Sequence, residues 1–171
     1  MIVVGIDIGL SGAFAVAQDA NLLALEDLPI RERPGTAMIR REIDAKQLAF
    51  RLRATLGDRI DEAIAVLENV RGMRKGGDAS PQGSSSVFAF GETKGAIRGV
   101  CESLGIETKW VEPIVWKRWF GIAKDEKGTF AREKATVVFG TTATAGMLDR
   151  VKDHNRAEAC LLARYGWQKW G

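Results

Sequence analysis

The sequence predicts an α/β fold, and three observations carry that prediction. Residues 2–8 (IVVGIDI) are β-branched and continuously apolar, as a central strand is. Two more apolar segments, 12–18 and 21–28, each follow a short turn, so these three strands must form an antiparallel meander. A second buried strand at 61–70 and another at 107–113 come later, with a helical segment between them. We therefore expect a mixed five-stranded sheet, an antiparallel meander plus parallel strands, flanked by helices.

Four helices are predicted around this sheet. Asp44 caps the first, which runs over 45–57 with three leucines on one face and Gly57 at its end. The others cover 87–105, 129–140 and 154–166. The segments 30–42 and 71–86 are polar, or rich in glycine, serine and basic residues, and are predicted to be loops.

Composition restricts the class of protein. A chain of 171 residues with 46% hydrophobic and 27% charged residues fits one globular domain over residues 1–171. No apolar run approaches the roughly 20 residues of a membrane span, and the start does not resemble a signal peptide, so we expect a cytoplasmic protein without a membrane partner. Cys101 and Cys160 lie in apolar, helix-like settings and are expected to be buried free thiols. With a single histidine, a zinc cluster is excluded.

Charge is distributed unevenly along the chain. Acidic residues outnumber basic ones over residues 1–70, and basic residues outnumber acidic ones over 71–171. This asymmetry suits a phosphate-rich partner that meets an acidic site, although an ordinary solvated surface gives a similar pattern.

Two carboxylates are expected to share one end of the sheet. Asp7 ends the first strand and Glu68 ends the strand within 61–70. If these strands are neighbours, their backbones lie about 4.8 Å apart and both acids point into one site, where a divalent cation would relieve their repulsion. Taken singly, Asp7 is equally consistent with a turn and Glu68 with a surface charge.

A further set of polar residues begins the last helix. His154 and Glu158 are four residues apart and share a helix face, and Asp153 at the helix start could cap or ligate. Oxygen-rich sites favour Mg²⁺ or Mn²⁺. His154 alone would more often be a surface residue, and Asp153 alone an N-cap.

Three glycines stand four residues apart in the helix over 87–105. Gly91, Gly95 and Gly99 lie on one stripe, and each costs a helix interior about 1 kcal/mol, so something must approach closely there. Two explanations remain open: tight packing on the domain's own sheet, or a subunit interface.

Together these motifs resemble the RuvC family of Holliday junction resolvases. The matching segments are DIGLSGAFAV, AVLENV, FAFGETKGAIRG, WKRWFGI and KDHNRAEACLLARYG, in this order. The WK..FG and DH.RAE signatures are similar to the phage-type and chloroplast-type branch. The resemblance implies a ribonuclease H-like fold, a homodimer, and hydrolysis of DNA at four-way junctions by two Mg²⁺ ions per active site, with Mn²⁺ as a substitute and no small-molecule cofactor. It also implies a bacterial or phage-encoded protein.

The resemblance also implies roles for individual residues. Asp7 would bridge two metal ions, Glu68 would be the second-strand ligand, and the last helix would supply Glu158 with His154 or Asp153. The family pair is spaced i, i+3, and here the i−3 position is Asn155, so the spacing favours His154. Lys127 is the candidate for a catalytic lysine, with Lys124 and Lys134 as substitutes. No aromatic wedge residue follows Glu68.

The remaining expectations concern DNA and the second subunit. Trp116, Trp119 and Phe120 could stack on unpaired bases, although core packing is the favoured role for at least two of the three. Expected DNA contacts are Arg71, Met73, Arg74, Lys75, Lys94, Trp116, Lys117, Arg118, Lys124 and Lys134. The expected dimer interface comprises Val87, Phe88, Gly91, Gly95 and Gly99.

Three rival functions share parts of this pattern. Actin-like and sugar kinases also use a DIG motif, but they close a cleft between two domains of this fold. An RNA-processing relative of the YqgF kind has the same fold and is the closer enzyme rival. A non-catalytic DNA-binding module would be expected to have lost an acid, and no strand acid is missing here.

Overall fold

The computed structural model describes residues 1–33, 41–69, 84–122 and 129–171. Its centre is a five-stranded sheet in the order β3-β2-β1-β6-β7. The strands are β1 (Ile2–Asp7), β2 (Ala13–Gln18), β3 (Asn21–Asp27), β6 (Ala63–Glu68) and β7 (Glu107–Val111). β1, β2 and β3 pair antiparallel, whereas β6 runs parallel to both β1 and β7. The predicted mixed sheet is confirmed.

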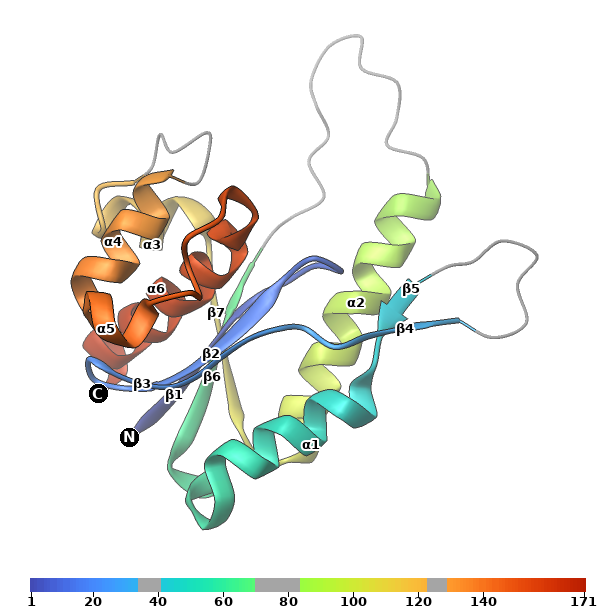
Figure 1. Cartoon of the computed structure of the whole chain (residues 1–171). Coiled ribbons are helices and arrows are strands. Elements are labelled where there is room, and N and C mark those ends of the chain that lie inside the picture. Colours follow the sequence, from blue (N-terminus) through green and yellow to red (C-terminus); the bar gives the residue numbers. More distant parts are fainter. Residues whose placement is uncertain (34–40, 70–83, 123–128) are drawn as a thin grey trace, which may run out of the picture.

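Helices cover both faces of the sheet (Figure 1). One face carries α1 (Ala45–Leu56) and α2 (Ser84–Ser103); the other carries α3 (Pro113–Trp119), α4 (Thr129–Phe139), α5 (Thr141–Thr144) and α6 (His154–Trp170). Short 3₁₀ turns, Gly57–Glu62 and Val151–Asp153, follow α1 and precede α6. Alternate residues of β1 enter the two cores: Val4 and Ile6 lie in the cluster with α1 and α2, and Val3 lies in the cluster with α6.

Helix α1 begins and ends as its sequence predicts. The Asp44 side chain accepts a hydrogen bond from the Gln47 backbone N at 2.9 Å, and Gly57 ends the helix with a φ of 55°. Leu48, Leu52 and Leu56 are buried on its inner face. The helix is therefore positioned by its cap and its apolar stripe.

The segment 30–42 is not wholly a loop, which corrects the sequence prediction. β4 (Ile30–Glu32) and β5 (Arg41–Ile43) form a separate two-stranded antiparallel sheet. A salt bridge of 2.9 Å from Arg31 to Glu42 joins them. Strands of three residues, mostly polar, have too little alternation to be recognised from sequence.

Both cysteines are free and buried, as predicted. Burial raises the pKa of Cys101 and of Cys160 to about 12, so neither thiol is reactive at neutral pH. Among the described helices, none has the length and apolarity required to cross a bilayer.

Helix α6 lies directly against β1. A Cβ atom added at Gly5 would meet the Ala159 carbonyl O at 2.2 Å and the Ala163 N at 2.3 Å, so only glycine fits there. About two turns beyond Ala159 in α6, a Cβ atom added at Gly166 would meet the Val66 Cγ2 at 2.4 Å. The α6 backbone therefore packs on the sheet with almost no side chain between them.

Two ion pairs fix α6 along the meander. Arg156 makes a bidentate contact with Asp27 at the end of β3, with distances of 2.6 and 2.9 Å. Arg164, a half-turn beyond the middle of the helix, pairs with Asp19 in the β2–β3 turn. The close packing on β1 fixes the distance of α6 from the sheet, and the two ion pairs fix its position along its own axis.

The glycine stripe of α2 faces outward. Gly91, Gly95 and Gly99 are exposed, and a Cβ added at any of them would have no described atom within 4 Å. The opposite face of the helix buries Ile97, Val100 and Cys101. Tight packing on the domain's own sheet is therefore the wrong explanation for the stripe, and the subunit interface stays a prediction.

The contact between α6 and β1 predicts opposite effects for two glycine substitutions. Gly5→Ala should lower the free energy of unfolding by about 3 kcal/mol, because the added methyl group meets backbone atoms that cannot move independently. Gly95→Ala is the matched control, since its methyl group enters open space and alanine favours a helix; it should raise stability by about 0.5–1 kcal/mol. Urea denaturation followed by circular dichroism measures both. Equal effects would contradict the packing described for Gly5.

Candidate active site

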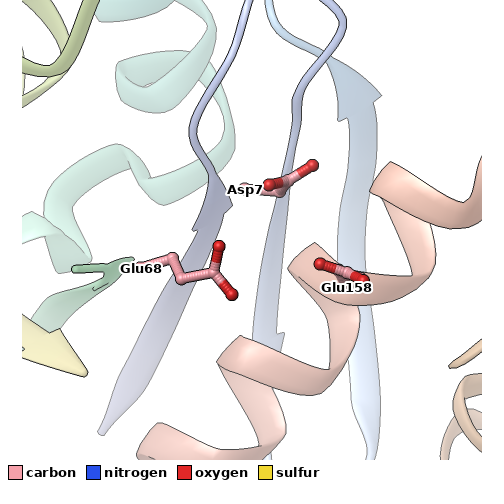
Figure 2. A group of neighbouring side chains, drawn as sticks. All are labelled: Asp7, Glu68 and Glu158. Atoms are coloured by element: carbon pink, nitrogen blue, oxygen red, sulfur yellow. The ribbon is translucent and has the colours of Figure 1, made fainter. Parts of the chain in front are cut away.

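Three carboxylates from three elements meet at one end of the sheet. Asp7 ends β1, Glu68 ends the adjacent parallel strand β6, and Glu158 lies in the second turn of α6. One oxygen of each lies within 4.8 Å of the others (Figure 2). The pairing of Ile6 with Leu67 brings the first two strand ends level. The two strands are therefore neighbours, which is the condition for the shared site expected from the sequence.

The electrostatics of this group are unfavourable without a counter-charge. Burial, followed by repulsion from Glu158 and Glu68, raises the pKa of Asp7 from 3.8 to about 8. Burial also raises the pKa of Glu68, with Lys117 and the Trp116 hydrogen bond acting in the opposite direction. Glu68 is 7% exposed, so water screens it little. The arrangement concentrates negative charge where a cation would be stabilised.

Helix α3 supplies a partner to each of two carboxylates. The Trp116 Nε1 donates a hydrogen bond to Glu68 Oε1 at 3.0 Å, and the Lys117 Nζ donates to Glu158 Oε1 at 2.7 Å. Burial lowers the pKa of Lys117, but the hydrogen bond and attraction to Glu158 outweigh it, so the pKa lies above its usual value. Two consecutive residues therefore contact two different acids of the site.

These contacts correct the prediction that Trp116 stacks on a base, whereas the phosphate contact expected of Lys117 stays a prediction. Trp116 has no exposed surface, so it cannot stack on a base, whereas Trp119, one turn later, is 54% exposed. Lys117 is paired with Glu158 and belongs to the carboxylate site in this conformation. The sequence marked both residues through the WK pair, but not their roles.

The start of α6 shows how Asp153 and His154 lie, and their part in holding a metal stays a prediction. Asp153 is buried, and its carboxylate accepts hydrogen bonds from the Arg150 backbone and guanidinium, which hold the pKa of Asp153 below its usual value. The His154 Nδ1 lies 3.1 Å from the Val151 carbonyl O. Among the described acids, histidine and cysteines, the close group comprises Asp7, Glu68 and Glu158, without Asp153 or His154. Asn155 Nδ2 donates to the Ser11 carbonyl in the loop after β1.

The other expected DNA contacts are dispersed. Lys94 on α2 donates to the Asn69 Oδ1 at 3.0 Å and lies over the Trp110 ring at 4.3 Å. Arg118 is exposed and Lys134 is half-buried. Six expected residues lie outside the described part of the chain: Arg71, Met73, Arg74, Lys75, Lys124 and Lys127.

The donor set fits a hard divalent cation. Three carboxylates offer oxygen ligands at short mutual distances. Burial, and then repulsion from Glu158 and Glu68, raises the pKa of Asp7, and Lys117 opposes this only in part. Mg²⁺ prefers such ligands and keeps several waters, so these three acids suit it.

A mixed sheet in this order, with acids at the ends of β1 and β6 and a third on the last helix, defines a ribonuclease H-like fold. Two solved structures share it across the whole chain. A Thermus thermophilus RuvC in complex with a Holliday junction substrate has a TM-score of 0.58 at 17% identity, covering 100% of this chain and 96% of that one. A second Thermus thermophilus RuvC structure has a TM-score of 0.51 at 14% identity, covering 99% of this chain and 96% of that one. No protein-family model and no curated protein matches the sequence.

These likenesses confirm the predicted fold class. Membership of the phage-type and chloroplast-type branch stays a prediction. At 17% and 14% identity, the likeness shows how the chain folds and not which reaction it performs.

The raised pKa of Asp7 predicts how stability depends on pH. The folded state binds the Asp7 proton more tightly than the unfolded chain, whose aspartate titrates near 3.8, so the Asp7 contribution to stability falls as the pH rises from 3.8 to about 8. Asp7→Asn removes this dependence. In EDTA its melting temperature should exceed that of the wild type by a margin that widens between pH 5 and pH 8. Added Mg²⁺ should narrow the margin by stabilising the wild type; a margin independent of pH would contradict the assignment.

Proposed function

We propose that this protein is a metal-dependent endonuclease that cuts four-way DNA junctions. The observation that carries the proposal is the group of Asp7, Glu68 and Glu158, placed at the end of the sheet in a fold shared with a RuvC bound to a Holliday junction. Acids on two adjacent strand ends and on the last helix suit the cleavage of a phosphodiester that approaches this open end.

The three acids would hold two Mg²⁺ ions, with Mn²⁺ as a substitute. Paired divalent cations supply an activated water and stabilise the leaving oxygen in phosphodiester hydrolysis. The protein's own contribution is positional. Asp7 would hold the ions from the end of β1, the Trp116 hydrogen bond orients Glu68, and the packing of α6 on β1 positions Glu158. We retain His154 as a proposed further ligand, which would require its ring to leave the Val151 carbonyl.

DNA contacts and a second subunit complete the proposal. Lys94, Arg118 and Lys134 would bind phosphates, together with the basic residues of 71–75 and Lys124. Lys127 is the proposed catalytic lysine. A twofold dimer would place two identical sites on two equivalent strands of a junction, so that both are nicked symmetrically. The outward glycine stripe of α2, flanked by Val87 (50% exposed) and Phe88 (67% exposed), is the proposed interface.

The test is cleavage of a labelled four-way junction with Mg²⁺, beside a linear duplex of the same sequence. The wild type should nick the junction symmetrically and leave the duplex intact. Glu68→Gln should abolish cleavage while junction binding persists, because the phosphate contacts lie elsewhere. Glu107→Gln is the matched control: Glu107 lies at the far end of the sheet, opposite Ile64, and should be dispensable.

The same assay separates the alternatives. Cleavage of structured RNA with an intact junction would favour the YqgF-like function. Tight junction binding without cleavage in either Mg²⁺ or Mn²⁺ would indicate a binding module. A Glu68→Gln protein that still cuts at the wild-type rate would refute the assigned site.

The proposed dimer gives a separate prediction. Gly95→Leu should weaken self-association, because its side chain would occupy the space through which two helices approach. The substitution creates no clash within the described chain, so the fold should persist and the melting temperature should change little. Light scattering of the wild type and the variant measures this. A wild type that is monomeric at micromolar concentration, both free and on a junction, would exclude the dimer.

A further inference from the structure

Lys117 is a positive charge that already occupies the carboxylate site. Its ammonium contacts Glu158 at 2.7 Å, and the two side chains are only 26% and 16% exposed. The same charge partly opposes the rise in the pKa values of Asp7 and Glu68, so its field reaches those two acids as well as Glu158. A lysine at this position is both a partner of the site and a rival for any other cation.

The ammonium is free to move without disturbing the helix that carries it. Helix α3 is anchored by the fully buried Trp116 and its hydrogen bond to Glu68. The Lys117 side chain keeps 26% of its surface exposed, and its Nζ lies 5.1 Å from the Trp116 ring centroid. Its long side chain can therefore give up Glu158 while the backbone of α3 stays fixed.

We propose that Lys117 is an internal counter-cation that competes with the divalent metal for Glu158 and thereby weakens metal binding. This inference rests on the proposed metal-dependent function. Without a metal, Lys117 holds the acids together; when a metal binds, it must be displaced or remain as an unfavourable neighbouring charge. Either course lowers the metal affinity of the site.

A second consequence links the metal to DNA. Once the metal binds Glu158, the displaced Lys117 ammonium can contact a phosphate at the same end of the sheet. A phosphate that holds Lys117 removes the competitor, so DNA and metal should strengthen each other's binding by the same factor. The sequence-based prediction that Lys117 contacts phosphate and its observed contact with Glu158 then describe two states of one side chain.

The experiment is a titration of EDTA-treated protein with Mn²⁺, with bound metal measured by the loss of the free-ion electron paramagnetic resonance signal. Lys117→Met, which keeps the length of the side chain and removes the charge, should bind Mn²⁺ about tenfold or more tightly than the wild type. Lys117→Gln, a second neutral variant, should change the affinity in the same direction. Lys117→Arg, which keeps the charge, should stay near the wild type. Lys109→Met removes a lysine from the exposed pair with Glu107 and is the control for a general loss of positive charge.

Melting temperatures give an independent readout. In EDTA, Lys117→Met should melt below the wild type, because the acids lose their counter-charge, and saturating Mn²⁺ should raise its melting temperature by more than that of the wild type. A merely structural lysine would lower the melting temperature without tightening Mn²⁺ binding.

The outcomes are distinguishable from failure of the proposed function. A wild type that binds no Mn²⁺, together with neutral variants that bind none, would overturn the metal-dependent function and this inference with it. A wild type that binds Mn²⁺ while the neutral variants bind it equally or more weakly would overturn the inference alone. Lys109→Met matching the neutral variants would also overturn it, since the effect would then be one of overall charge.

Discussion

The close contact between α6 and β1 is the constraint on which the rest of the structure depends. At Gly5 the helix backbone lies against the strand backbone, so that an added Cβ would meet the Ala159 carbonyl and the Ala163 amide. Gly5 and Asp7 point to the same side of the strand, and Glu158 directly precedes Ala159. The spacing that packs the helix is therefore the spacing that brings Asp7 and Glu158 within reach of one cation. A larger residue at Gly5 would lift the helix and open the site together, so here core packing and site geometry are one requirement.

The same packing creates the electrostatic problem that the site is built around. Three acids converge at a partly buried sheet end, and the pKa of Asp7 rises to about 8 as a result. Converging buried acids lower stability, and the proposed cation would offset that loss. Helix α3 limits that loss with two different interactions: a neutral indole N–H that orients Glu68, and a mobile ammonium that offsets the charge of Glu158. The first is fixed by burial, and the second can be exchanged.

Local sequence patterns predicted the parts of this arrangement that depend on local physics. The continuous apolar run of β1, the short turns of the meander and the Asp44 cap are encoded within a few residues, and each was found where expected. The shared position of Asp7 and Glu68 could be predicted from the same patterns, because adjacent parallel strands bring their carboxyl ends together. The remaining features depend on how each helix is oriented against the sheet, which local sequence patterns do not specify. Trp116 and Trp119 are one turn apart in a short helix, and only the packed structure shows that the first is buried and the second exposed. His154 shares a helix face with Glu158 by spacing, but the preceding 3₁₀ turn directs its ring to the Val151 carbonyl.

Helix α2 shows how a feature with no local benefit acquires meaning from its surroundings. Three interior glycines each lower the stability of the helix by roughly 1 kcal/mol. No packing contact within the described chain offsets this, because a Cβ added at any of them would have no described atom within 4 Å. Its inner face is fully used by Ile97, Val100 and Cys101, so the helix is held in place by the core while its outer face stays open. The same helix also reaches the site, because Lys94 bonds the side chain of Asn69, the residue after Glu68. A partner docked along the outer face of α2 would thus be connected to the end of β6 through one hydrogen bond. Because the glycines lie on the same helix as Lys94, assembly along the outer face of α2 would be coupled to the carboxylate site through the Lys94–Asn69 hydrogen bond.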